Sequence, residues 1–342
     1  MNQYLSLSLS PTLTLRFAAG CVLSVAVSSV FAQGAARNDA ASGYPNRIVT
    51  MIAPYAPGAA TDTEGRLFAN QLSKQLGQQY VVDFKPGAGT SIGQGIVARA
   101  APDGYTLLLM SATFPLFPLV FKDLPFDPMK DLAPISLMSK RSALLLVHPS
   151  LPANNMKEFV AYAKANPDKV NFATAGPGGL QHLTGLWLAS LANIKMTYIH
   201  YKGTGSLMPD MLAGRSHMTP TTFSTGMPLV KSGKLKALGV ASLERNKSVP
   251  DWPTVEEQGF KDFEYTTWLG VLAPAKTPPA IINKLSSELN KVTKAPEVVK
   301  TLGDSTTLIG STPEAFRKHI MSEHERWKKL VAENNITFEL ND

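Results

Sequence analysis

The chain has 342 residues, of which 44% are hydrophobic and 17% are charged, and its formal net charge is +7. This length predicts about two domains, and the composition is that of a folded globular protein rather than a disordered or fibrous one. The basic residues are scattered, without a dense run interleaved with aromatic residues. This pattern excludes a typical nucleic-acid surface, whereas a mildly basic surface suits the capture of small anions.

The first 32 residues differ from the rest. An apolar run over 17–32 is short for a membrane span and ends in Val30-Phe31-Ala32, a small-residue cleavage pattern. We predict a signal peptide at 1–32 and a mature protein from Gln33; an uncleaved anchor is the alternative. Because Cys21 is the only cysteine, the mature protein would lack disulfides, thiol catalysis and cysteine-bound metals.

From residue 48 onward, segments with strand and helix patterns alternate, which predicts an α/β protein with a mostly parallel sheet. We expect strands at 48–53, 80–84, 105–110, 142–147, 170–173, 196–200, 235–241 and 264–272. We expect helices near 61–76, 91–100 and 155–165, and one carrying Leu183, Trp187 and Leu191 on one face. The C-terminal part shows two more helical stripes, and Thr312 with Pro313 is typical of the start of the second one.

The stretch Tyr55-Ala-Pro-Gly-Ala-Ala-Thr-Asp62 follows the first strand and precedes the first helix. Gly58 allows the backbone to approach a ligand closely, and Thr61 or Asp62 can cap the helix. Free N–H groups and a partial positive charge at a helix start attract anions. We therefore hypothesise that this turn binds a carboxylate; an ordinary turn in the core is the alternative.

Glycine-rich turns recur after four of the expected strands, at 56–62, 86–91, 174–181 and 201–206. In open α/β sheets, ligands bind beyond the carboxyl ends of the strands. Two turns from each of two lobes would converge on one cleft and favour a ligand with two anionic ends.

Other candidate residues have equally plain structural explanations. None of the six histidines is paired at metal-ligand spacing, so no metal site is predicted. His182 stands beside a glycine turn, where a ligand contact and a structural role are both open. Trp268 either walls a pocket or packs in the core, and Lys202 either pairs with an anion or is an exposed lysine.

Gly89-Thr-Ser-Ile-Gly93 matches the G-x-S-x-G pattern of serine hydrolases, between a strand and a helix. Three residues separate it from the strand, and no HGGG-type oxyanion loop precedes it. A secreted serine hydrolase with Ser91 as nucleophile is therefore the alternative function.

The chain resembles the Bug-type periplasmic solute receptors of tripartite tricarboxylate transporters. Seven segments carry the resemblance, in family order over 44–342: Tyr44-Pro-Asn-Arg-Ile-Val49, Pro54-Tyr-Ala-Pro-Gly-Ala-Ala-Thr-Asp62, Lys85-Pro-Gly-Ala-Gly-Thr90, Ala101-Pro-Asp-Gly-Tyr-Thr-Leu-Leu-Leu109, His200-Tyr-Lys-Gly203, Gly233-Lys-Leu-Lys-Ala-Leu-Gly-Val240, and Trp268-Leu-Gly270 with Pro274-Ala-Lys-Thr-Pro278.

The resemblance implies a type II periplasmic binding protein, in which two α/β lobes joined by two crossing strands surround a ligand cleft. One lobe is expected to hold 44–141 plus 266–342 and the other 142–265. It also implies a monomeric, non-enzymatic receptor, without cofactor or metal, that captures a small carboxylate and delivers it to the membrane subunits of the transporter. The residues expected to bind the ligand are Tyr55, Ala56, Gly58, Ala59, Asp62, Phe84, Gly87, Ala88, Gly89, Thr90, Ser111, Gly176, Gly178, Gly179, His182, Tyr201, Lys202, Thr221 and Trp268.

This sequence departs from the family pattern at four positions. The family commonly has Asn at Phe84, Gly at Ala59, and acids near His217 and Thr221. Without those acids nothing would neutralise a ligand ammonium, which disfavours amino acids. Phe84 would stack on a ring if it faced the cleft, which raises aromatic dicarboxylates such as terephthalate as ligands; it would equally fit the core.

Overall fold

The computed structural model describes residues 41–333, apart from 56, 58, 59, 122, 202, 304 and 305. The strands are β1 (Val49–Ala53), β2 (Tyr80–Phe84), β3 (Thr106–Ser111), β4 (Leu132–Val147), β5 (Asn171–Thr174), β6 (Thr197–His200), β7 (Met218–Thr222), β8 (Lys236–Ala241), β9 (Thr266–Pro274) and β10 (Thr307–Leu308). The α-helices are α2 (Ala60–Leu76), α3 (Ser91–Ala98), α4 (Phe117–Val120), α5 (Pro128–Asp131), α6 (Met156–Ala165), α7 (Leu180–Ala192), α8 (Thr204–Leu212), α9 (Phe223–Lys231), α10 (Pro279–Val292), α11 (Pro296–Leu302) and α12 (Pro313–Glu333). Short 3₁₀ turns lie at Ala88–Thr90 and Phe114–Leu116.

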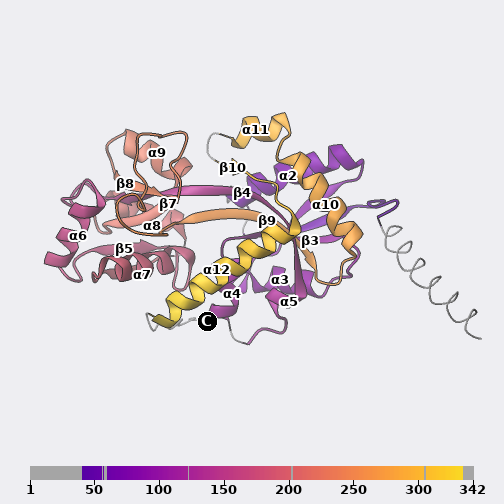
Figure 1. Ribbon diagram of the computed structural model, residues 1–342, viewed down its shortest axis with the longest axis horizontal. Helices are drawn as coiled ribbons and strands as arrows, with labels where there is room; N and C mark the ends of the chain where they lie inside the picture. Colours follow the sequence, from indigo (N-terminus) through magenta and orange to yellow (C-terminus); the bar gives the residue numbers. More distant parts are fainter. Residues whose placement is uncertain are drawn as a thin grey trace, which may run out of the picture.

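Two α/β lobes lie at the two ends of the molecule and are joined by the long strands β4 and β9 (Figure 1). The strand order is β2-β1-β3-β9-β4-β7-β5-β6, with β8 and β10 also paired to β4. β1, β2 and β3 are parallel in the first lobe, and β5, β6 and β7 are parallel in the second. β9 and β4 are antiparallel to each other and belong to both lobes, which confirms the predicted fold with two crossing strands.

The strand β4 is longer than the sequence pattern predicted. We expected a strand over 142–147, but β4 begins at Leu132 and has 16 residues. Pro134 and two register irregularities against β9, at 134–136 and 137–139, break the alternation of apolar and polar residues that marks a strand. The first half of β4 is therefore a strand because β9 pairs with it, rather than because of its own sequence.

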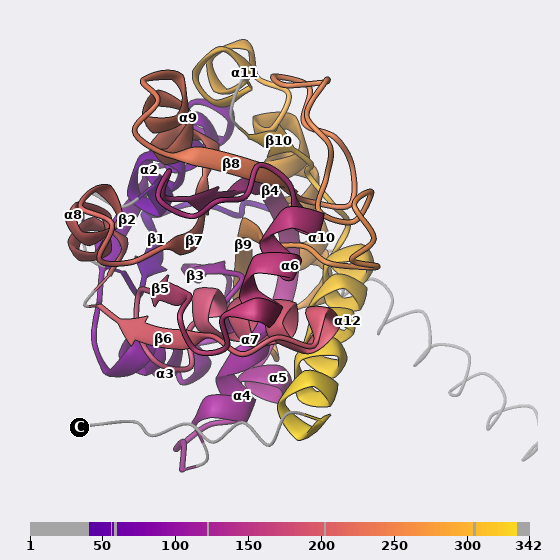
Figure 2. The same cartoon turned by 90° about the vertical axis from the view of Figure 1, so that its left-hand side faces the viewer.

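Helices cover both faces of each lobe. In the first lobe, α2, α10 and α11 pack on one face, while α3 and α12 pack on the other. In the second lobe, α6 and α7 lie on one face and α8 and α9 on the opposite one, as the view of this lobe shows (Figure 2). A continuous set of buried residues runs from the first lobe into the second beneath the crossing strands, and includes Phe316, Trp268 and Phe172.

The C-terminal helix α12 contacts both lobes. Phe316 packs against Trp268 in β9, whereas near the other end of the helix the ring of Trp327 lies 5.8 Å from that of Trp187 in α7. Thr312 caps the helix by accepting a hydrogen bond from the N–H of Ala315, as predicted. Because α12 bridges the two lobes, the assignment of all of 266–342 to the first lobe stays a prediction, as do the exact lobe boundaries.

Most predicted elements are found within two or three residues of their expected ends, and β2 agrees at both ends. Gly77 ends α2 with a positive φ of 68°, and its N–H donates to the carbonyl of Ser73, as expected for a C-cap. Leu191 was expected on the buried face of α7 but is exposed. The sequence pattern did not predict β7, α8 and α9, because Pro209, Pro220 and Pro228 interrupt it.

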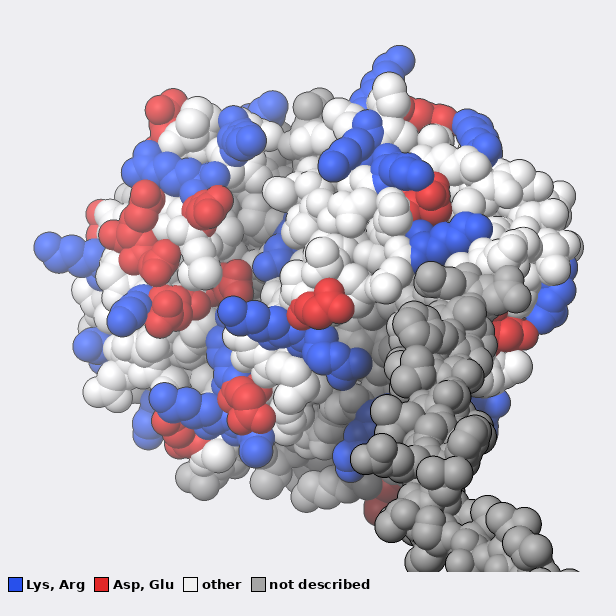
Figure 3. Space-filling model, turned by 45° about the vertical axis from the view of Figure 1, so that its right-hand side comes forward, with Lys and Arg blue, Asp and Glu red and all other residues white. Residues whose placement is uncertain are grey.

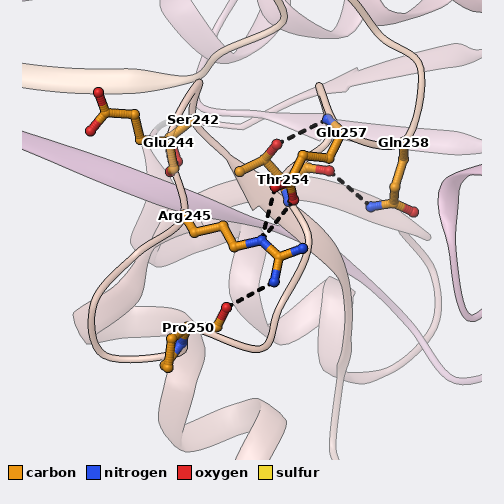
Figure 4. A network of polar contacts seen from close by, with 7 residues as sticks. All are labelled: Ser242, Glu244, Arg245, Pro250, Thr254, Glu257 and Gln258. Atoms are coloured by element: carbon orange, nitrogen blue, oxygen red, sulfur yellow. Dashed lines mark hydrogen bonds and ion pairs between the residues drawn. The ribbon is translucent and has the colours of Figure 1, made fainter.

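A network of polar contacts holds the segment that returns the chain from β8 to β9 (Figure 4). Thr254 and Glu257 cap each other's backbone N–H groups, and Arg245 forms an ion pair with Glu257 at 2.9 Å. Gln258 donates to the carbonyl of Leu238 and accepts from the N–H of Met156. This segment is therefore tied to the outer part of the second lobe, so it delivers the chain to β9 in a fixed position.

On the face of the molecule that Figure 3 shows, lysine and arginine side chains are interspersed with acidic ones, and no large patch carries a single sign. None of the helices in the described part of the chain has the length and apolar character of a membrane span.

Candidate functional site

The strand directions place the carboxyl ends of both parallel sets at the junction of the lobes. β3 is antiparallel to β9 and thus runs in the same direction as β4, toward the second lobe; β7 is antiparallel to β4 and runs toward the first lobe. Ser111 at the end of β3 is level with Ser139 of β4, and Thr222 at the end of β7 is level with Ala143. Measured along β4, the two sets of strand ends are four residues or about 13 Å apart, a separation that suits a small molecule.

The first turn is tied to the end of β3. The Tyr55 hydroxyl donates a hydrogen bond to Ser111 Oγ at 2.8 Å and accepts one from the Ser111 N–H at 2.8 Å. Burial raises the pKa of the Tyr55 phenol, which therefore stays protonated. The bond fixes the chain leaving β1 next to Ser111, so both predicted ligand residues come together.

Asp62 in the first turn of α2 forms an ion pair with Arg66 one turn later. Asp62 therefore has a structural partner within α2. The predicted ligand residues Ala56, Gly58 and Ala59 lie outside the described residues.

The second turn has an unusual backbone. Gly87, Ala88, Gly89 and Thr90 all have positive φ angles, of 130°, 43°, 60° and 90°. The Thr90 N–H already donates to the carbonyl of Gly87 at 2.9 Å, and the Ser91 N–H to that of Ala88, so only the earlier N–H groups of the turn could meet an anion. The two non-glycine residues are strained in this conformation, which fits a loop shaped for binding rather than for stability.

Phe84 precedes this turn at the end of β2. Its side chain is half-buried against the core of the first lobe, and the guanidinium carbon of Arg66 lies 4.9 Å from its ring centroid. One face of the ring is therefore already occupied, and its stacking on an aromatic ligand stays a prediction.

In the second lobe, side chains hold the turn after β5 in place. Thr174 Oγ1 accepts from the Gly176 N–H, Gln181 Oε1 accepts from the Ala175 N–H at 2.7 Å, and Gln181 also donates to the carbonyl of Pro220. Gly176 and Gly178 have positive φ, and Gly179 precedes the first turn of α7. Gln181 was not predicted, because glutamine in the first turn of a helix carries no distinctive sequence signal.

His182 and His200 form a pair of imidazoles beside this turn. Their ring centroids are 4.6 Å apart, His182 Nδ1 accepts from the Gly178 N–H at 3.1 Å, and His200 Nδ1 lies 2.7 Å from Thr174 Oγ1. Burial, and then the charge of His200, lower the pKa of His182 to about 4, and burial lowers the pKa of His200. Both rings are therefore neutral at pH 7, and His182 carries its proton on Nε2, where it is a hydrogen-bond donor.

The remaining predicted residues have structural partners or lie outside the described residues. The Tyr201 hydroxyl donates to Asp210, and Lys202 is not described. Thr221 is buried in β7. Trp268 is fully buried, and its indole N–H donates to Glu323 at 2.9 Å. The structure therefore places Trp268 in the core, which is the second of its two interpretations.

Ser91 begins α3 and does not resemble a catalytic nucleophile in its surroundings. Within the described ranges no histidine or carboxylate is hydrogen-bonded to it. The described residues also contain no group of three or more metal-ligating side chains.

A buried ion pair connects the first site helix to the crossing strands. Arg141 in β4 and Glu64 in α2 are 8% and 2% exposed, and Arg141 NH1 lies 2.8 Å from Glu64 Oε1. Ser139 Oγ donates to Glu64 Oε2 at 2.8 Å. This pair was not predicted, because the two residues are 77 positions apart and neither lies in a motif.

The comparisons with known proteins agree on one family. Residues 65–336 match the model of the "Tripartite tricarboxylate transporter family receptor". The structure of periplasmic binding protein BugD is 33% identical, with a TM-score of 0.73 over 86% of this chain and 100% of that chain.

Two further solved structures hold ligands. Rpa4515 of R. palustris with adipate is 27% identical, with a TM-score of 0.76 over 86% of this chain and 99% of that chain. MatC from Rhodopseudomonas palustris with bound malate is 31% identical, with a TM-score of 0.72 over 84% and 100%. Each of these ligands carries two carboxylates.

Proposed function

This chain belongs to the tripartite tricarboxylate transporter receptor family, and from that premise we propose that it captures a small dicarboxylate between its lobes in the periplasm. Members of this family are periplasmic binding proteins and not enzymes, so the hydrolase alternative built on Ser91 is set aside. The proposal includes delivery of the ligand to the membrane subunits of a tripartite tricarboxylate-type transporter. It also includes cleavage of the signal peptide after Ala32, which lies outside the described residues.

The observation that supports the proposal is that the parallel strands of the two lobes run toward each other, so their carboxyl ends lie at the junction of the lobes. The turn Gly87–Thr90 and the bonded pair Tyr55 and Ser111 lie on one side. The turn after Thr174 and the neutral imidazoles stand on the other. A ligand with an anionic group at each end would meet hydrogen-bond donors in both lobes, and adipate and malate in the similar structures have this form.

The described residues of the two first-lobe turns contain no arginine, and Lys85 is paired with Asp83 at 3.2 Å. Neutral donors would therefore hold the carboxylates: backbone N–H groups in the first lobe, and chiefly the Nε2–H of His182 in the second, where the N–H groups of Ala175, Gly176 and Gly178 are already bonded. Closure of the lobes by a hinge at β4 and β9 would remove water from these bonds and strengthen them.

Thermal unfolding of the protein with aliphatic dicarboxylates of four to eight carbons tests the proposal. A ligand that binds only the folded state adds about 2.7 kcal/mol at 100 times its dissociation constant, which raises the midpoint clearly. We expect a selective rise with one chain length, and none with the monocarboxylate of equal length. A flat response to every dicarboxylate would contradict the proposal.

Aromatic dicarboxylates stay a second candidate because of Phe84. Terephthalate in the same panel, with the variant Phe84→Asn, separates the two ligand classes. Unchanged affinity of the variant for terephthalate would remove the role of Phe84.

A further inference from the structure

The predicted ligand turns follow the four outer strands of the sheet. The crossing strand β9 pairs with β3, and β4 pairs with β7, so β1 and β2 lie farther out in the first lobe and β5 and β6 in the second. Seen along the molecule, these four strands lie on one side of β4 and β9, and α12 lies on the other (Figure 2). A rotation about β4 and β9 that brings the ligand turns together would therefore draw the second lobe away from α12, if α12 moves with the first lobe.

Two contacts hold α12 to the first lobe. In its first turn, Phe316 packs on Gly270, a residue of β9 that pairs with β3. Farther along the helix, His324 Nδ1 donates to the carbonyl of Pro115 at 2.8 Å. Pro115 belongs to the 3₁₀ turn that follows β3. The helix is therefore attached to the first lobe as far as His324.

One turn later, α12 contacts the second lobe. The buried ring of Trp327 lies 5.8 Å from that of Trp187 in α7, edge to face. The guanidinium carbon of Arg326 lies 5.2 Å from the ring centroid of Trp187 and 5.1 Å from that of Trp327. Arg326 Nη1 also lies 2.7 Å from Glu264 Oε1, in the segment that enters β9 from the second lobe. Together these four residues form a rear contact between the lobes.

The rear contact depends on the distance between α12 and α7. An aromatic pair, or a cation over an aromatic ring, stabilises only when the groups lie within about 7 Å of each other. A hinge rotation that separates the two helices would lose this stabilisation. A contact that is present only in the open arrangement enlarges the open population, and the apparent affinity of a ligand that needs the closed arrangement falls with the closed fraction.

We propose that the rear contact opposes closure of the lobes and thereby lowers the affinity for the ligand from a position that the ligand does not touch. On this geometry the described arrangement, in which the rear contact is intact, is the open one. The inference rests on the proposed capture of a ligand between the lobes. It makes Trp187, Arg326 and Trp327 residues that set the affinity without binding.

Calorimetric titration with adipate, or with another dicarboxylate if thermal unfolding selects one, tests the inference. Trp327→Leu removes the aromatic pair and should raise the affinity about tenfold. Arg326→Gln keeps the pair, loses the cation, and should raise the affinity about threefold. Trp187→Leu removes the same pair from the second lobe, so it should give a gain like that of Trp327→Leu, and the double variant should add little to it.

Phe316→Leu is the matched control, because it shortens a buried aromatic side chain on the same helix within the first lobe. It should lower the midpoint of thermal unfolding, as Trp327→Leu does, and leave the affinity unchanged. A rear contact with only a structural role would change stability and not affinity. An equal gain in affinity in Phe316→Leu, or no gain in Trp327→Leu and Arg326→Gln, would therefore overturn the inference.

Small-angle X-ray scattering without ligand separates this inference from the proposed function. Arg326→Gln/Trp327→Leu should have a smaller radius of gyration than the unchanged protein, because more of its molecules are closed, whereas Phe316→Leu should not. If no dicarboxylate binds the unchanged protein, the proposed function fails and scattering alone decides on the rear contact. Equal radii of the unchanged protein and the double variant would then rule out its role in closure.

Discussion

Replacing Arg141 by methionine tests the buried ion pair that joins α2 to the crossing strand β4. The change leaves the carboxylate of Glu64, which is 2% exposed, with only the Ser139 hydroxyl as a partner. Removing one partner of a buried pair costs about 3–5 kcal/mol, because the other charge stays buried without compensation. We therefore expect the free energy of unfolding of Arg141→Met to fall by about that amount at pH 8.

The loss should depend on pH. Burial raises the pKa of Glu64 even beside Arg141, and removing Arg141 raises it further. A carboxyl group whose pKa is higher in the folded state binds more protons there, so the stability it gives is present at low pH and declines as pH rises through the raised pKa. The variant should therefore be closer to the unchanged protein at pH 5 than at pH 8.

Urea unfolding followed by circular dichroism at both pH values measures these differences. The double variant Glu64→Gln/Arg141→Met removes both charges and should recover most of the loss. Lys74→Met is the matched control on the same helix, because it breaks the exposed pair with Glu297 and should cost less than about 1 kcal/mol. A loss below about 1 kcal/mol for Arg141→Met at pH 8, or a double variant as unstable as the single one, would refute the reasoning.

Three further predictions concern single residues. Burial raises the pKa of Glu323 to about 7. In urea unfolding, Glu323→Gln should therefore stabilise the protein by about 3 kcal/mol at pH 8 and by less than about 1 kcal/mol at pH 5. Equal gains in stability at the two pH values would contradict this prediction. A bound dianion should raise the low pKa of His182, so the affinity for the dicarboxylate should increase as pH falls toward 5.5, by at most about tenfold per pH unit for one proton. Calorimetry in two buffers measures the proton uptake on binding. His182→Gln should reduce this proton uptake. Gly89→Ala places a Cβ against the Phe121 ring at a φ of 60° and should cost about 1–2 kcal/mol of stability as well as ligand affinity. Gly205→Ala, which meets open space in α8, should not reduce stability.

The parts of the fold that the sequence predicted are those with a local signal. The alternation of apolar strands and glycine turns over 48–111 predicted β1, β2 and β3 with nearly their observed bounds. A threonine followed by proline predicted the start of α12. The first half of β4 and the short strand β7 lacked such a signal, because their apolar pattern is interrupted by Pro134 and Pro220. Their conformation depends on pairing with strands that are distant in the sequence, which local reasoning cannot supply.

The same limit applies to the site. Tyr55 and Ser111 could be named as ligand residues, but the bond between them joins positions 56 residues apart. For Phe84 and Trp268 the sequence left the role open. An aromatic residue near a predicted turn can line a cleft or pack in the core, and no sequence feature separates the two. The burial of Trp268 places it in the core, whereas the stacking of Phe84 on a ligand stays a prediction, with Arg66 over one face of its ring.

The position of β9 between β3 and β4 has a consequence for the order in which the chain can fold. β3 and β4 follow each other in the sequence, yet neither is hydrogen-bonded to the other, because β9 from residues 266–274 fills the place between them. During synthesis, the sheet of the first lobe must therefore wait until more than 150 residues have followed its third strand. Such distant pairing makes folding slow, so the first lobe cannot complete its sheet until synthesis has reached the last quarter of the chain.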